Sequence, residues 1–517
     1  MDTVKHIFRG VDDSTIPLMP VHEFTHGSRD PEEDSSPYYT AFSGRHGRQS
    51  LRRRCLVVLT AALVVASTIL VLILRARPPA VPSSSTNDTT TTLRDPDDAA
   101  SRARLDVDAL LAAQSSTLPE ASARYTLRNQ RATPPHYDRW FKFAQEKKCL
   151  VDNYDQIRRV QPFYHWQLAE RDPQEYFRAM IERASTHLDA HPAEIAVVEI
   201  KDGNAYLKGE TAYGSSWPGT LGRFSQFLPN MTFLLNGRDE PSRGLQLSRT
   251  QRLNDRALAK RFQALHFSPR PTVEFFQHQS GCIIPKAADG FVESANDASG
   301  FLLATAKPGF STDFYPMLSM SKISPCFSDI LFPIEYPYTR SWWYGRYAYP
   351  DDIGWEDKIS KVYWRGMSNG GMIIGQNYHL FARFKLVDIC PEHPDLMDVA
   401  ITRFAETLLR RGPREDLYKY KYAMNVDGTT FSGRFLGLLR SGSLVFKSTL
   451  FEEYFNDWLR PFEHYIPVKA DLSDLVQQIR WANDNPAEAR LIQQRGMEVA
   501  KRVVTDDQND CYFSLLC

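Results

Sequence analysis

The stretch NVDGTTFSGRFLGLLRSGSLVFK, residues Asn425–Lys447, carries the clearest signature of a fold in this chain. Its apolar start ends in a short polar loop, four apolar side chains then recur at helical spacing, and the apolar segment SLVFK follows. A strand, a loop, a helix and a second strand in this order are typical of parallel sheets covered by helices. The stretch therefore predicts an α/β architecture.

The loop in this stretch has the composition of an anion-binding site. Ser432 is placed to cap a helix that we predict over Ser432–Arg440, Gly433 lets a ligand approach the backbone, and Arg434 supplies positive charge. A guanidinium in the first turn opposes the helix dipole, so ligand binding explains Arg434 better than helix stability does. A surface arginine paired with a carboxylate is an equal alternative on spacing alone.

Short apolar runs alternate with helical patterns on both sides of this stretch. Leu472–Ala482 and a segment from Asn485 to Val503 are predicted helices, the second with a proline at its first position. The predicted strands are EIAVVEI (Glu194–Ile200), MTFLLN (Met231–Asn236), KVYWRG (Lys361–Gly366), FKLVDIC (Phe384–Cys390), SLVFK (Ser443–Lys447) and HYIPVK (His464–Lys469). We expect two domains, residues 136–345 and residues 346–517.

Two further strand ends carry side chains suited to chemistry. Arg365 and Ser368 follow the strand in KVYWRGMSNGG, at the carboxyl edge where ligands bind in open α/β folds. Arg365 and Arg434 together would suit a diphosphate, although a solvated arginine at a strand end is an equal alternative.

Asp239 follows the strand MTFLLN, in the turn NGRDEP. A carboxylate at a strand end often acts as a general base. Its neighbour Glu240 points the opposite way in an extended chain, so the two do not form the facing carboxylate pair of a glycosidase. A single base, Asp239, is the more economical interpretation, and a turn in which Asp239 caps backbone amides is the alternative.

Other polar residues give weaker signals. His379 and His464 are most simply packed in the core or beside a site. Asp95, Asp97 and Asp98 form a DxD-like string away from any predicted strand, so we do not interpret them as a metal site. No Cys-x-x-Cys motif or histidine–cysteine cluster indicates zinc. We predict no metal site.

The amino-terminal part predicts a membrane anchor. Cys55–Leu74 is 20 residues without a charge, the length needed to cross about 30 Å of hydrocarbon. More arginines precede this segment than follow it, which places residues 1–54, a polar tail predicted to be disordered, in the cytosol. Residues 75–135 follow as a luminal stem, rich in Pro, Ser and Thr at its start. We therefore expect a type II single-pass protein, and the mean hydropathy of −0.41 excludes a polytopic one.

Cysteine usage and charge narrow the compartment and the partners. Six of the seven cysteines lie beyond the predicted span, an even number suited to an oxidising lumen, and they allow up to three disulfides in 15 connectivities. The chain carries no KDEL-like signal, so we expect the Golgi membrane, with the ER membrane as the alternative. Basic and acidic residues number 62 each, which gives no reason to expect a nucleic-acid partner.

These segments together resemble glycosyltransferase family 90, the group of fungal capsule-associated xylosyltransferases and animal protein O-glucosyltransferases. The resemblance runs from RATPPHYDRWFKFAQ at Arg131 through KVYWRG to FSGRFLGLLRSGSLVFK, HYIPVKADLSDL and the final helix. It implies a GT-B fold, with two Rossmann-like domains facing a cleft, and inversion at the anomeric carbon. By motif, it also implies that Asp239 is the catalytic base, that Arg365 binds the diphosphate, and that UDP is held by Thr429, Thr430, Phe431, Ser432, Gly433 and Arg434.

The predicted activity is the transfer of a sugar, xylose as first choice, from a UDP-sugar to a hydroxyl of a mannose-containing glycan. UDP-glucose with a protein serine acceptor is the runner-up, and a catalytically inactive glycan-binding protein of the same fold is a second class. Retention of a base beside the arginines argues against the inactive protein. No tightly bound cofactor or divalent ion is expected, because the arginines and the helix end would meet the charge of the leaving diphosphate.

Overall fold

The computed structural model describes residues 97–154, 178, 181–182, 195–209, 217–239, 317–323, 329–333, 338–339, 352–370, 377–404, 407–408 and 414–517. The chain divides into two units, Met1–Thr91 and Thr92–Cys517, and every described residue belongs to the second. Within these ranges, no helix combines the length and apolar character that a membrane crossing requires. The predicted span, Cys55–Leu74, lies outside them, so it stays a prediction.

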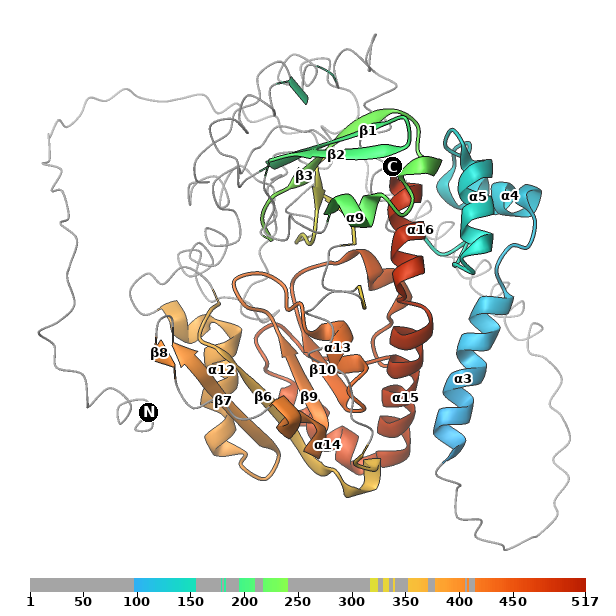
Figure 1. Cartoon of the computed structure of the whole chain (residues 1–517). Helices are drawn as coiled ribbons and strands as arrows, with labels where there is room; N and C mark the ends of the chain where they lie inside the picture. Colours follow the sequence, from blue (N-terminus) through green and yellow to red (C-terminus); the bar gives the residue numbers. More distant parts are fainter. Residues whose placement is uncertain are drawn as a thin grey trace, which may run out of the picture. The chain divides into compact units, whose positions relative to one another are not determined.

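The carboxyl-terminal part is built on a six-stranded sheet (Figure 1). Its strands are β6 (Ile359–Met367), β7 (Met397–Phe404), β8 (Thr407–Leu408), β9 (Tyr420–Val426), β10 (Leu444–Ser448) and β11 (Ile466–Pro467). They lie in the order β11-β10-β9-β6-β7-β8, and all neighbours are parallel except β7 and β8. In chain order the five parallel strands therefore run 2-1-3-4-5, one of the two common orders of a doubly wound sheet.

Helices cover both faces of this sheet, as the alternation of strands and helices predicts. The helices are α12 (Ala382–Ile389), α13 (Phe435–Leu439), α14 (Leu475–Asp484) and α15 (Pro486–Arg502). On β10, Val445 shares a core with Leu438 of α13, whereas the next residue, Phe446, shares another with Leu386 of α12 and Ile479 of α14. Successive strand residues thus bury their side chains on opposite faces.

Most predicted elements are confirmed, but FKLVDIC (Phe384–Cys390) is a wrong prediction. The segment is largely α12, a helix that buries Arg383 and Leu386. A short apolar run without clear alternation is compatible with either a strand or a buried helix, and here helical packing prevails. β7, with the sequence MDVAITRF, was not predicted because polar residues interrupt its apolar ones.

A five-stranded sheet, the first sheet, precedes this six-stranded one, the second sheet, in the chain. It consists of β1 (Ile195–Lys201), β2 (Asn204–Lys208), β3 (Met231–Asn236), β4 (Leu318–Ser319) and β5 (Ile330–Leu331), in the order β2-β1-β3-β4-β5. β1 pairs antiparallel with β2 and β3, whereas β3, β4 and β5 are parallel. The α/β class is therefore confirmed, with a mixed first sheet. A short helix, α9 (Trp217–Leu221), precedes β3, whose end delivers Gly237, Arg238 and Asp239.

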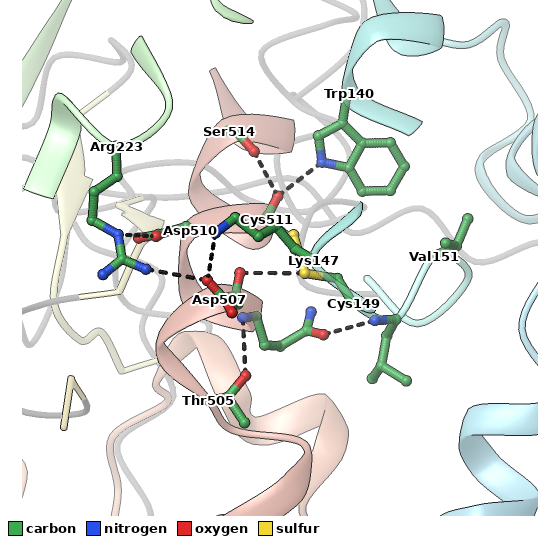
Figure 2. Close-up of a disulfide and its surroundings, with 12 residues drawn as sticks. Trp140, Lys147, Cys149, Val151, Arg223, Thr505, Asp507, Asp510, Cys511 and Ser514 are labelled. Carbon is green, nitrogen blue, oxygen red and sulfur yellow. Dashed lines mark hydrogen bonds and ion pairs between the residues drawn. A yellow bond between two sulfur atoms is a disulfide. The ribbon is translucent and has the colours of Figure 1, made fainter. Parts of the chain in front are cut away.

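The last helix, α16 (Asp506–Leu516), packs against residues of the first sheet and against α5 (Tyr137–Glu146). Phe513 of α16 lies at the centre of an aromatic group, with ring centroids 5.3–6.1 Å apart among its members Trp217, Phe224, Phe233, Phe332 and Phe513. Figure 2 shows a disulfide joining Cys511 of α16 to Cys149, with Trp140 Nε1 donating to the Cys511 carbonyl at 2.9 Å. The segment after α5 is therefore covalently linked to the last helix.

Part of the range predicted as stem is helical and packed. α3 (Asp97–Ala112) lies beside α15 (Figure 1), while α4 (Leu118–Asn129) follows it in the chain. Ion pairs join Asp106 to Arg495 at 2.6 Å and Asp108 to Arg502 at 2.5 Å. Of the other cysteines, Cys390 and Cys517 are free thiols, and Cys282 and Cys326 fall outside the described ranges.

Candidate active site

The second sheet has its topological switch point between β6 and β9, because the chain continues from β6 to β7 on one side and later adds β9 on the other. Ligands of doubly wound sheets bind outside the carboxyl ends of the strands at such a point. The segments at these two strand ends are residues 365–370, which include the last residues of β6, and residues 427–434, which follow β9. Every sequence-predicted donor-site residue lies in these two segments.

Arg434 immediately precedes α13, and its guanidinium lies over the ring of Trp364, 5.7 Å from the ring centroid. Its Nη1 donates to the Arg365 carbonyl at 2.8 Å. Its Nη2 is buried and has no hydrogen-bond partner among the described residues. A buried donor without a partner is costly, so this geometry favours an incoming acceptor such as a phosphate oxygen.

A second guanidinium, that of Arg383, lies 5.7 Å from the same Trp364 ring. Arg383 is 8% exposed, and it donates from Nε to the Asp427 carbonyl at 2.9 Å and from Nη1 to the Met367 carbonyl at 3.0 Å. Burial, and then the positive charge of Arg434, lower the pKa of Arg383 to about 9. A buried cation and a half-buried one near each other are stabilised by an anion, which makes this pair the centre of the candidate site.

Arg383 was missed by sequence reasoning because it sits directly before the segment wrongly predicted as a strand. The geometry also explains the glycine that faces it. A Cβ atom on Gly428 would lie 2.8 Å from Arg383 Nη2 and 2.9 Å from Asn369 Nδ2. Only glycine therefore lets the 427–434 loop approach the guanidinium this closely.

Arg365 makes different contacts from those we expected. Its Nη2 pairs with Asp398 Oδ1 at 2.6 Å, its Nη1 donates to the Asp398 carbonyl at 2.8 Å, and the group lies 4.5 Å from the Tyr363 ring centroid. Tyr420 donates its hydroxyl to the same carboxylate. The side chain of Arg365 thus binds Asp398 of β7, and its backbone carbonyl accepts the hydrogen bond from Arg434. Its role as a phosphate ligand stays a prediction.

The remaining predicted donor-site residues differ in how far they are buried. Phe431 is 8% exposed and belongs to the hydrophobic core, while Gly433 is exposed and Thr429 and Ser368 are half-buried. Ser432 does not cap α13, which corrects our expectation, because the helix begins at Phe435 and no side chain caps it. The Ser432 hydroxyl is instead buried without a hydrogen-bond partner in the described part of the chain.

Asp239 lies against this loop although it is far away in the sequence. Thr430 Oγ1 donates to Asp239 Oδ2 at 3.1 Å, and Ser321 Oγ approaches the Asp239 carbonyl at 3.5 Å. In the same turn Asn236 Oδ1 accepts from the Arg238 amide at 3.1 Å, and the residues after Asp239 lie outside the described ranges, so the alternative in which Asp239 caps backbone amides stays open. The structure therefore brings Asp239, the candidate base, to the 427–434 loop. Glu240 lies outside the described residues.

Three buried ionisable side chains interact near this loop: Asp427 directly follows β9, Lys447 belongs to β10, and Glu453 lies in the segment after β10. Burial raises the pKa of Asp427 to about 7 and that of Glu453 to about 8, and it lowers the pKa of Lys447 between them. The Lys447 ammonium lies 3.9 Å from the centroid of Phe435, the first residue of α13. Sequence reasoning took Asp427-Gly428 only as the start of a loop and missed this cluster.

The raised pKa of Asp427 predicts a pH-dependent stability. The folded chain keeps this proton at pH values where the unfolded chain, with a carboxyl pKa of about 4, has released it. The free energy of unfolding should therefore fall as pH rises from about 4 to about 7. Asp427→Asn, neutral throughout, should remove roughly 2–4 kcal/mol of that decline, as measured by urea denaturation at several pH values. Parallel profiles for the two proteins would contradict this assignment.

The two histidines considered earlier lie away from the site contacts. His379 is exposed and 3.9 Å from Asp388, whereas His464 is buried and its Nδ1 accepts from the Arg460 amide at 2.8 Å. Burial lowers the pKa of His464 to about 4. In the ranges that the structure covers, no group of three or more His, Cys, Asp or Glu side chains is arranged to hold a metal ion. Asp95 is outside those ranges, and Asp97 and Asp98 begin α3.

Comparison with known proteins supports the resemblance for the carboxyl-terminal part. Residues 349–517 match the sequence model of the family described as Glycosyl transferase family 90. Protein O-glucosyltransferase 2 of Danio rerio is 34% identical over 172 residues, 31% of this chain and 32% of the relative. Protein O-glucosyltransferase 3 of Homo sapiens is 32% identical over 168 residues, 31% of each chain. Protein O-glucosyltransferase 1 of Rattus norvegicus is 29% identical over 233 residues, 39% of this chain and 55% of the relative.

The chain therefore spans about a third of the length of the first two relatives and about half of the third. The family match contains the whole second sheet and the segments 365–370 and 427–434. Asp239 precedes the matched range. The carboxyl-terminal part of this chain, residues 349–517, thus matches the family 90 model, as the sequence resemblance predicts.

Proposed function

We propose that this chain, which ends in a family 90 domain, is an inverting glycosyltransferase that moves a sugar from a UDP-sugar to a hydroxyl group. The observation that carries the proposal is the contact between Asp239 and the 427–434 loop, because it sets a carboxylate against the loop that ends in Arg434, whose guanidinium shares the Trp364 ring with that of Arg383. The names of the relatives support the same class of reaction. A binding protein would need the pocket but not the base.

In the proposed mechanism Asp239 acts as the general base. Its carboxylate takes the proton of an acceptor hydroxyl, and the acceptor oxygen bonds to the anomeric carbon of the donor. The bond from that carbon to the β-phosphate oxygen breaks on the opposite face, and UDP leaves with the electron pair. The configuration at the anomeric carbon is therefore inverted.

The leaving diphosphate gains negative charge, which Arg434 and Arg383 are placed to stabilise beside Trp364. Fixed cations at a developing charge can supply several kcal/mol of transition-state stabilisation. The Ser432 hydroxyl offers a further donor to the phosphate oxygens. Our proposal requires no divalent ion for this step, and it takes the two sheets as the facing domains of a GT-B enzyme.

The donor sugar and the acceptor have two candidates. The sequence resemblance to the fungal branch favours xylose and a mannose-containing glycan. The relatives are named protein O-glucosyltransferases, which favours glucose and a protein acceptor. The two donors differ by the C6 hydroxymethyl group, so the pocket that admits or excludes this group decides between them.

We also propose that the catalytic part lies in the lumen of the secretory pathway, with the Golgi membrane as first choice and the ER membrane as the alternative. A disulfide such as Cys149–Cys511 persists in an oxidising compartment and not in the cytosol. The predicted span Cys55–Leu74 would anchor the protein in type II orientation.

The proposal is tested by incubating the detergent-solubilised full chain with UDP-xylose, UDP-glucose, UDP-galactose and UDP-N-acetylglucosamine. Each donor is offered with a mannoside, with a serine-containing peptide and without an acceptor, and released UDP and glycosylated product are both measured. We expect one donor and one acceptor class to give product with inverted configuration. UDP binding without product from any pair would favour the inactive binding protein instead.

A further inference from the structure

Thr430 belongs to the loop expected to hold UDP, yet its hydroxyl is engaged with Asp239. Its side chain is 3% exposed, and Oγ1 donates to Asp239 Oδ2 at 3.1 Å. Its carbonyl accepts from the Gly428 amide at 2.8 Å, which closes the turn that holds it. The hydroxyl is therefore held on a fixed piece of backbone and aimed at the carboxylate.

The consequence for Asp239 is that one carboxylate oxygen is occupied. No donor to Oδ1 is found among the residues that the structure describes. A hydrogen bond to one oxygen restricts rotation of the carboxylate about its terminal torsion, which is otherwise soft. A positioned base transfers protons more efficiently than a mobile one, because fewer orientations must be lost in the transition state.

The same contact joins two parts of the chain that carry separate tasks. Asp239 follows β3 of the first sheet, and Thr430 sits in the loop after β9 of the second, four residues before Arg434. We infer that Thr430 is a positioning residue whose hydroxyl orients the Asp239 carboxylate and ties the base to the donor-binding loop. This inference rests on the proposed function, since it assigns Thr430 a task in that reaction.

Thr430→Val tests the inference, because valine has nearly the same shape and lacks the hydroxyl. We expect kcat at saturating donor and acceptor to fall about 10- to 100-fold, the range for a hydrogen bond to a charged group. The dissociation constant of UDP, measured by calorimetry, should change by less than about 3-fold. Thr430→Ser restores a hydroxyl and should recover most of the lost kcat, which a purely packing role of the side chain would not produce.

Several outcomes would overturn the inference. Wild-type kcat in Thr430→Val would show that the hydroxyl does not position the base. If UDP affinity is weaker while kcat is unchanged, Thr430 serves donor binding alone. Failure of Thr430→Ser to recover activity in a folded protein would show that packing and not the hydroxyl matters. If Thr430→Val unfolds, Thr430→Ala removes the same hydroxyl with a smaller side chain and is compared with Thr430→Ser in the same way.

A double-mutant cycle separates this inference from the proposed function. In an Asp239→Asn background, the further change Thr430→Val should cost little, because both act through one proton transfer. Independent, multiplying losses would refute the coupling and leave the general base in place. Full activity of Asp239→Asn itself would instead refute the proposed mechanism, whatever Thr430 does.

Discussion

Asp239→Asn is expected to abolish sugar transfer while UDP still binds. The asparagine keeps the size of the side chain and an oxygen that can accept from Thr430 Oγ1, but it cannot take a proton from the acceptor. Positioned general bases typically contribute about 10²- to 10⁴-fold to a rate, so kcat should fall by that factor. Product formation measures the loss, and calorimetric titration with UDP measures the retained affinity.

Asp395→Asn is a control for the loss of a carboxylate, because Asp395 is exposed, lies within residues 349–517 and makes none of the site contacts described above. Its kcat should equal that of the wild type. Near-normal turnover by Asp239→Asn would move the base elsewhere, with the adjacent Glu240 as the first candidate. A loss of UDP binding in parallel with the loss of kcat would show that the substitution disturbs the donor loop and not only the proton transfer.

Local sequence patterns predicted most strands and helices of the second sheet, because hydrophobic periodicity depends only on residues that are close in the sequence. The loop and strands of Asn425–Lys447 appear nearly as expected, and α15 begins at the proline that marks its first turn. FKLVDIC shows the limit of such patterns. Its composition suits a strand, yet the packing of Leu386 against strand residues of β6 and β9 makes it helical.

The contacts within the site could be predicted only in part. The motif resemblance grouped Asp239 with the 429–434 loop, and the structure places them 3.1 Å apart through Thr430. The spacing of residues in the sequence could not predict the ion pair between Arg365 and Asp398. The side chains near a strand end depend on which strand lies beside it, and here that strand is β7. For the same reason, nothing local identified Arg383 as the companion of Arg434.

The second large effect that we expect is a loss of UDP affinity when Arg434 is removed. Arg434→Ala removes a guanidinium whose Nη2 has no protein partner among the described residues, so the folded state loses little beyond the bond to the Arg365 carbonyl and the contact with the Trp364 ring. A charge-assisted bond to phosphate is typically stabilising by about 1.5–3 kcal/mol, so the dissociation constant of UDP should rise about 10- to 100-fold. Isothermal titration at low and high salt measures this change.

Arg383 should behave differently because its guanidinium also holds the loop. Arg383→Lys keeps the charge but loses the fork that reaches the carbonyls of Asp427 and Met367, so it should weaken UDP binding and lower the melting temperature together. Arg460→Ala, at an exposed arginine that pairs with Glu463 in the described part of the chain, is the control for a general loss of positive charge. Unchanged UDP affinity in Arg434→Ala would refute the phosphate site. Loss of affinity in Arg434→Ala but not in Arg383→Lys would reduce Arg383 to a support of the loop, since a direct phosphate ligand would not tolerate losing its second donor.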